Sequence, residues 1–324
     1  MADLEDHQPF TVEHTGAASG DVDAPEQHPP LDELTRAQAL LAAQPVVEGH
    51  TTPPRVFDPE DLAPVRAAEA GVQLWSLRAH PSPGHHPSSS ADAPTPRPDE
   101  GVVGTLRRID RIRALVAAYP EELRLAQSTA EMAHAVNCGR VAALLGPVSW
   151  SALAGSIAAV RAYHALGVRA VNLTRFDGFA RDAVREMNRL GLVVDLSGAD
   201  PETVRRTLAV ARAPVLSTRA DPEELTDDVL GLFGENGGVC MLPVTEDLPA
   251  TADALDRVRA LAGPHCVGLS HTTDPAAGYA PLFAELLRRD WTAPDLVALA
   301  HDNATRTLRE AEFLARTSRP RRAA

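Results

Sequence analysis

Lysine is missing from this sequence, because all 31 of the Lys and Arg side chains among its 324 residues are arginines. The absence excludes Schiff-base catalysis by a lysine amine and a phosphate-binding loop built on a lysine. Cysteine is also scarce, and we interpret Cys138, Cys240 and Cys266 as reduced core residues of a cytoplasmic protein. The formal net charge of −13 argues against nucleic acid or an anionic membrane surface as the main partner.

Long apolar runs are missing as well, and no stretch approaches the ~20 residues that span a bilayer. The N-terminus is acidic and has no apolar signal core, so we expect no secretory signal. Composition predicts a disordered acidic tail at 1–30 and a disordered basic tail at 314–324. Between them we expect one domain, 31–313, with a low-complexity loop at 80–100 inside it.

Short apolar segments alternate with amphipathic helical patterns along this domain. The predicted strands are 44–50, 71–77, 123–127, 140–146, 168–174, 192–196, 214–217, 239–244 and 266–270. The alternation indicates βα units and a parallel sheet covered on both faces. Eight or nine such strands favour an α/β fold of the (β/α)8 TIM-type barrel class, and no Gly-rich dinucleotide motif follows the first strand. Helices at 224–233, 282–289 and 296–308 are predicted towards the C-terminus.

In such a barrel the chemistry lies where the strands end. Segment 191–198 is an apolar run that ends at Gly198, a residue with no side chain for acid–base or metal chemistry. The metal-ligand types at the strand ends are His50, His271 and Asp274. Spacing alone does not tell whether they converge, since His271 also fits a hydroxyl-bonded loop residue and Asp274 a turn.

Several segments are similar to one known family, in the same order along the chain. They are QPVVEGH at 44–50, QLWS at 73–76, AALLG at 142–146, EMNRLG at 186–191, DLS at 195–197, LLRRDWT at 286–292 and DN at 302–303. On these segments the chain resembles the membrane (renal) dipeptidases, zinc peptidases built on the metal-dependent-hydrolase barrel. The resemblance covers about residues 31–311. It implies two zinc ions, bridged by a glutamate, that activate water to attack the peptide bond of a dipeptide.

The metal-binding positions that this resemblance implies are mostly replaced. His50 is retained, but the aspartate two residues later in the family is Thr52 here. The bridging glutamate falls at Val148. The two further metal-binding histidines fall at Gly198 and Arg219.

The catalytic and substrate-binding positions differ too. The family's catalytic aspartate falls at Thr272, with Asp274 two residues beyond it. The substrate-contacting histidine falls at Arg175, and the arginine that holds the substrate carboxylate falls near Glu223 or Glu224. Taken with the metal-binding positions, these replacements predict a dipeptidase-like chain that has lost its zinc site and is inactive as a peptidase.

The first functional hypothesis is therefore a non-catalytic homologue with no expected cofactor. Arg175 and Arg219 at the barrel mouth suit a carboxylate or phosphate, which would make the ligand small and anionic or peptide-like. Alternatively, the two arginines pair with nearby carboxylates such as Asp177 or Asp221 and bind nothing.

Two other hypotheses remain open. The chain could be an active metallo-dipeptidase or amide hydrolase whose single metal, zinc for example, is held by His50, His271 and Asp274. It could also be a regulatory partner, since members of the resembled family commonly dimerise. A homodimer, or pairing with an active paralogue, would fit that role.

Overall fold

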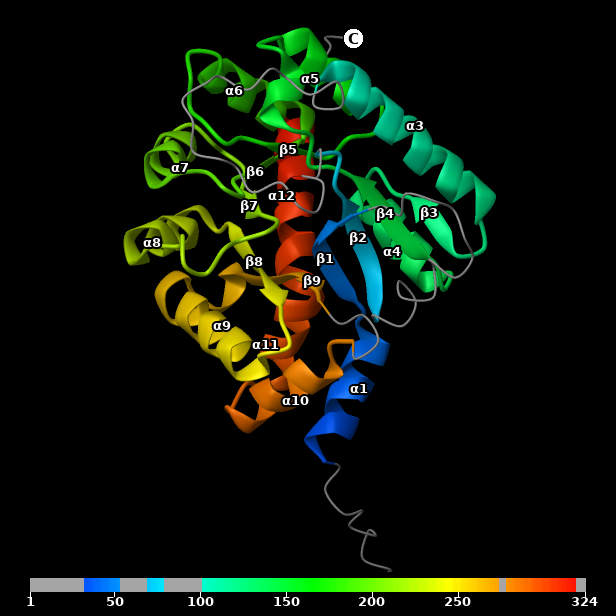
Figure 1. Ribbon diagram of the computed structural model, residues 1–324, viewed down its shortest axis with the longest axis vertical. Coiled ribbons are helices and arrows are strands. Elements are labelled where there is room, and N and C mark those ends of the chain that lie inside the picture. Colours follow the sequence, from blue (N-terminus) through cyan, green and yellow to red (C-terminus); the bar gives the residue numbers. More distant parts are fainter. Residues whose placement is uncertain (1–31, 53–68, 79–100, 274–277, 319–324) are drawn as a thin grey trace, which may run out of the picture. The chain divides into compact units, whose positions relative to one another are not determined.

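The computed structural model describes residues 32–52, 69–78, 101–273 and 278–318, all of one compact unit. Its strands are β1 (Val46–Thr51), β2 (Ala70–Trp75), β3 (Leu123–Leu125), β4 (Val141–Leu145), β5 (Ala170–Asn172), β6 (Val193–Asp195), β7 (Leu216–Ser217), β8 (Val239–Val244) and β9 (Val267–Thr272). Its α-helices are α1 (Glu33–Ala43), α3 (Val102–Ala118), α4 (Thr129–Asn137), α5 (Ile157–Ala165), α6 (Ala180–Leu190), α7 (Pro201–Leu208), α8 (Asp227–Asn236), α9 (Leu248–Ala262), α10 (Ala280–Arg288), α11 (Ala293–Val297) and α12 (Asn303–Thr317). Figure 1 shows the helices arranged around the strands.

The strands form one parallel sheet in the order β3-β4-β2-β1-β9-β8-β7-β6-β5. The sheet curls so that β4, near one end of this order, approaches β5 at the other end. Isolated parallel bridges there join Leu145 to Val168 and Val148 to Val171. β3 pairs with the first part of β4. The predicted α/β class and parallel sheet are confirmed. In the described residues the sheet has a ninth strand, and bridges rather than a continuous ladder join β4 to β5.

Alternate residues of the strands enter two hydrophobic clusters, as the two-residue period of a strand requires. In β1, Val46 belongs to the larger cluster and Val47 to the smaller one. The smaller cluster also takes Leu308 and Ala311 from α12, which packs against β6, β8 and β9. A Cβ added at Gly49 would lie 2.5 Å from the sulfur of Met241, so the side chains here leave no space beside β1. This packing holds the ends of β1, β7 and β9 in place.

Local signals set the helices that flank the candidate site. The carboxylate of Asp200 accepts a hydrogen bond from the Thr203 backbone N–H (2.9 Å), and Pro201 is the first residue of α7. Gly191 caps the C-terminus of α6, and its φ of 78° suits glycine. A Cβ at Gly191 would meet the Ala315 side chain at 3.2 Å, so glycine also allows the close approach of α12.

The C-terminal region departs from the prediction. The helix predicted at 296–308 is three pieces: α11, a π-helical turn (Ala298–Asp302) and α12. α12 continues to Thr317, so the first residues of the predicted basic tail at 314–324 are helical. The reason is that Ala311 and Ala315 extend the buried side of the helix, and small alanines are a weak signal of burial.

Two further expectations need correction. α8 begins at Asp227 rather than at the predicted residue 224. Cys138 is exposed at the C-terminal cap of α4, whereas Cys240 and Cys266 are buried as predicted. The predicted tail 1–30 and loop 80–100 lie outside the described residues. None of the described helices has the length and apolar character that a membrane crossing requires.

Candidate functional site

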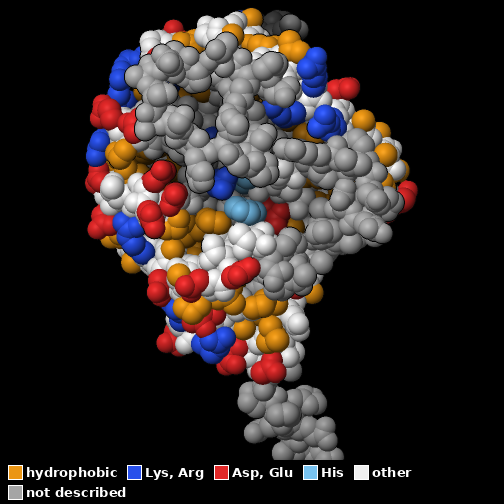
Figure 2. Space-filling view, viewed as in Figure 1, with side chains coloured by type: hydrophobic (Ala, Val, Ile, Leu, Met, Phe, Trp, Pro, Cys, Tyr) orange, Lys and Arg blue, Asp and Glu red, His pale blue; other side chains and the backbone are white. Residues whose placement is uncertain are grey.

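Three of the predicted site residues lie together where β1, β7 and β9 end. The ring centroids of His50 and His271 are 6.3 Å apart, with the ring planes at 61°. Burial, and then the positive charge of Arg219, hold the pKa of His271 below its ordinary value. His271 is therefore neutral at pH 7, and its Nδ1 lies 3.1 Å from the Ser270 hydroxyl. Figure 2 shows histidine, arginine and carboxylate surface side by side on one face.

A buried carboxylate, Asp195, organises the neighbouring strand ends. It accepts hydrogen bonds from the Asn172 amide (2.9 Å), the Ser197 hydroxyl (2.6 Å), and the Thr218 backbone N–H (2.8 Å) and hydroxyl (3.0 Å). The Ser197 hydroxyl in turn accepts from the backbone N–H of Arg219 (2.9 Å). One fully buried side chain thus connects the ends of β5, β6 and β7 and fixes the backbone that carries Arg219. The Asp-Leu-Ser pattern at 195–197 identified this segment in the sequence, but it did not predict the hydrogen bonds that Asp195 forms.

A second buried acid, Glu48 in β1, was not singled out from the sequence. Its carboxylate accepts hydrogen bonds from Gln73 Nε2 (2.7 Å), the Thr51 hydroxyl (3.0 Å) and the Tyr279 hydroxyl (2.6 Å). The Gln73 amide oxygen accepts from the Trp75 indole (2.9 Å). Burial raises the pKa of Glu48, and burial beside that acid raises the pKa of Tyr279 well above its usual range. An acid inside the apolar run 45–50 was the available signal, since a buried acid requires partners.

Val148 and Gly198 offer no donor atoms at the positions where the resemblance implies a bridging carboxylate and a histidine. The Val148 side chain is fully buried, and its backbone bonds to Ala170 and Asn172 tie it to β5. Gly198 has a φ of 69°, and a Cβ added there would meet nothing within 4 Å. A larger side chain would have space at residue 198 but would strain the backbone.

The two arginines expected at the barrel mouth are placed differently. Arg175 is exposed and forms an ion pair with Asp177 (3.5 Å), as the alternative expectation describes. Asp177 also accepts from the Trp150 indole (3.1 Å), so this pair belongs to a local network. Arg219 is exposed, and within the described residues it has no ion pair with Asp221 or any other carboxylate. Among the described residues, Arg219 therefore differs from Arg175 in having no carboxylate partner.

The threonines at the family positions lie where expected, at the strand ends. Thr52 directly follows β1, and Thr272 is the last residue of β9. Asp274 lies outside the described residues.

The described side chains do not fit a pair of zinc ions. Zinc sites need imidazole, thiolate or carboxylate ligands that converge. In the described part of the chain no three His, Cys, Asp or Glu side chains form such a group. Of the two imidazoles that approach one another, His50 and His271, the second has the positive charge of Arg219 near it.

Comparisons with known proteins agree on one family. The sequence profile "Membrane dipeptidase (Peptidase family M19)" matches residues 34–179 and 176–322. Dipeptidase 3 of Macaca fascicularis is 28% identical over 357 residues, covering 89% of this chain and 70% of that protein. Dipeptidase verJ of Clonostachys rogersoniana is 29% identical over 277 residues, covering 70% and 71%.

Solved structures share the fold. The probable dipeptidase PvdM from Pseudomonas aeruginosa aligns with a TM-score of 0.76 and 16% identity, over 87% of this chain and 99% of that one. A metallopeptidase from Rhodobacter sphaeroides, liganded with a phosphinate mimic of the dipeptide L-Ala-D-Ala, aligns with a TM-score of 0.71 and 17% identity, over 83% and 99%.

Proposed function

We propose that this chain, which belongs to the membrane dipeptidase family (peptidase family M19), has lost the binuclear zinc site and peptide-bond hydrolysis. It acts instead as a binding or regulatory homologue on the closed (β/α)8 barrel of that family. Its ligand is small and anionic or peptide-like, and binds beside Arg219 at the strand ends.

The observation that carries this proposal is the buried Val148 where the family resemblance places the bridging glutamate. A valine side chain has no lone pair, so the buried residue 148 cannot supply the anionic bridge. Gly198 removes a second ligand. Arg219 also places a positive charge near His271, which would repel a dication there, and exposure of the arginine side chain weakens this repulsion.

The same groups suit an anion. The backbone N–H of Arg219 donates to the Ser197 hydroxyl, which fixes the point from which the side chain extends. A guanidinium binds a carboxylate through two parallel hydrogen bonds. His271 is neutral at pH 7 and supplies a donor or an acceptor without adding charge. A dipeptide carboxylate can therefore be held here without the groups that would activate water.

A second candidate is an active metallo-dipeptidase with a rebuilt site. The approach of His50 to His271 at 6.3 Å favours it, and Asp274 would be the third ligand. In that case Arg219 would contact the substrate.

Metal analysis and turnover separate the two candidates. We expect the purified protein to hold much less than one zinc per chain, and to release no amino acids from a dipeptide panel with zinc, manganese or cobalt added. Calorimetry with the same dipeptides should show binding that Arg219→Gln weakens and that Arg107→Gln, an exposed change on α3, leaves unaltered. Chelator-sensitive hydrolysis would overturn the loss of function, and absence of any dipeptide binding would overturn the ligand assignment.

A further inference from the structure

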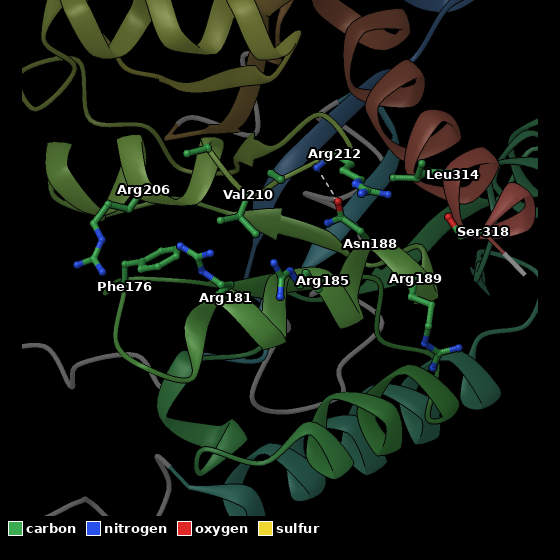
Figure 3. A pocket seen from close by; sticks show the side chains of 12 residues that line it. Phe176, Arg181, Arg185, Asn188, Arg189, Arg206, Val210, Arg212, Leu314 and Ser318 are labelled. Carbon is green, nitrogen blue, oxygen red and sulfur yellow. Dashed lines mark hydrogen bonds between the residues drawn. The ribbon is translucent and has the colours of Figure 1, made fainter.

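A groove of about 660 Å³ lies between α6, α7 and the end of α12. Figure 3 shows the side chains that line it. They include Phe176 from the segment after β5, Arg181 and Arg185 from α6, Arg206 from α7, and Arg212 from the segment after α7. The volume lies within the range of small-molecule sites.

The groove concentrates positive charge in a chain whose net charge is −13. Five arginines line it, because Arg189 joins the four named above, and none of the described lining residues is acidic. Two of the five have carboxylate partners on α6. Arg185 lies 3.7 Å from Asp182, and Arg189 bonds to Glu186 (2.6 Å).

The other three guanidiniums, those of Arg181, Arg206 and Arg212, form no ion pair within the described part of the chain. The contrast with Arg205 is informative, since that neighbour of Arg206 pairs with Asp228 on α8. These unpaired guanidiniums are spread along the groove, with Arg181 and Arg206 at its Phe176 end and Arg212 at the other end, so a ligand with separated anionic groups would find a positive partner at each end.

The groups are also held in position. The Arg206 guanidinium stacks over the Phe176 ring, 4.6 Å from its centroid, which leaves the N–H groups at the edge of the guanidinium plane available. Figure 3 shows Arg181 to the other side of that ring. At the far end, the buried Asn188 accepts from the backbone N–H of Arg212 (2.6 Å) and donates to the carbonyl of Val184 (2.9 Å). A ligand therefore meets partly pre-organised donors.

We propose that this groove binds a small molecule bearing two or more phosphate groups. A guanidinium group can form two parallel hydrogen bonds to phosphate oxygens. Three unpaired guanidinium groups have more hydrogen-bond donors than one carboxylate can accept. The partner is small, because the negative net charge disfavours a long nucleic-acid backbone or an anionic membrane. This site is independent of the proposed function, since neither Arg219 nor the histidines His50 and His271 line it.

Isothermal titration of the full chain with inorganic tripolyphosphate tests the proposal. The test variant is Arg181→Gln/Arg206→Gln. The matched control is Arg107→Gln/Arg111→Gln, which removes two exposed arginines from α3. We expect saturable 1:1 binding that weakens about tenfold or more in the groove variant and less than about twofold in the control.

Circular dichroism and thermal melting of each variant verify the fold. Phe176→Leu supplies a second test, because it frees Arg206 while retaining all charges, and we expect it to weaken binding by about threefold. Equal weakening in groove and control variants would mean that only net charge attracts the probe, and it would overturn the proposal. So would the absence of saturable binding to the unaltered chain.

Discussion

Replacing Asp195 by alanine should destabilise the protein more than any nearby surface change. The side chain is fully buried and holds three strand ends together through Asn172, Ser197 and Thr218. Hydroxyl donors can rotate to new partners, but the Thr218 backbone N–H cannot. The Asn172 amide keeps its hydrogen bond to the Ser197 carbonyl (3.0 Å), but its other N–H loses the Asp195 carboxylate. Leaving each rigid donor unsatisfied costs about 2 kcal/mol, so we expect a loss of about 4 kcal/mol.

Urea unfolding followed by circular dichroism measures this loss. Thermal melting gives a second measure of it. At roughly 2 °C per kcal/mol for a domain of this size, the melting temperature should fall by about 8 °C. Asp200→Ala is the matched control, because it removes an exposed aspartate that caps α7 and should cost only about 1 kcal/mol. If Asp195→Ala lowers the unfolding midpoint no more than Asp200→Ala does, the role of Asp195 as organiser of the strand ends is wrong.

Three further predictions concern acid, thiols and the missing histidine. Bonds to two arginines lower the pKa of Glu186 from 4.5 to about 2, so its contribution is present above pH 4.5 and lost as pH falls towards 2. The difference in the free energy of unfolding between the unaltered chain and Glu186→Gln is therefore at most about 3 kcal/mol near neutral pH. In acid-unfolding curves this difference should disappear as the pH falls from 4.5 towards 2. With a thiol reagent, only Cys138 should react in the native state, because burial raises the pKa of Cys266 to about 11 and raises the pKa of Cys240 well above its usual range. Fast labelling of two or three thiols would contradict this. Gly198→His should gain no zinc-dependent hydrolysis of dipeptides, since the other replaced positions remain, and a gain would show that our assignment of those positions is wrong.

The alternation of strands and helices could be predicted because each βα unit buries apolar residues at a regular period. Strand ends followed from the same pattern, so His50 and His271 could be named, but their approach depends on how far the sheet curls. The Glu48 network was not predictable, since Gln73 and Tyr279 are distant in sequence. The arginine-lined groove was not predicted from the sequence for the same reason. Arg181 and Arg206 line one groove only once α6 and α7 have packed together.

Zinc content measured together with dipeptide turnover is the most direct test of the central claim. The account predicts that protein purified in the presence of zinc, then freed of loose metal, holds well below one zinc per chain. It also predicts that the same sample hydrolyses no dipeptide. Two equivalents of zinc with hydrolysis that a chelator abolishes would contradict the claim.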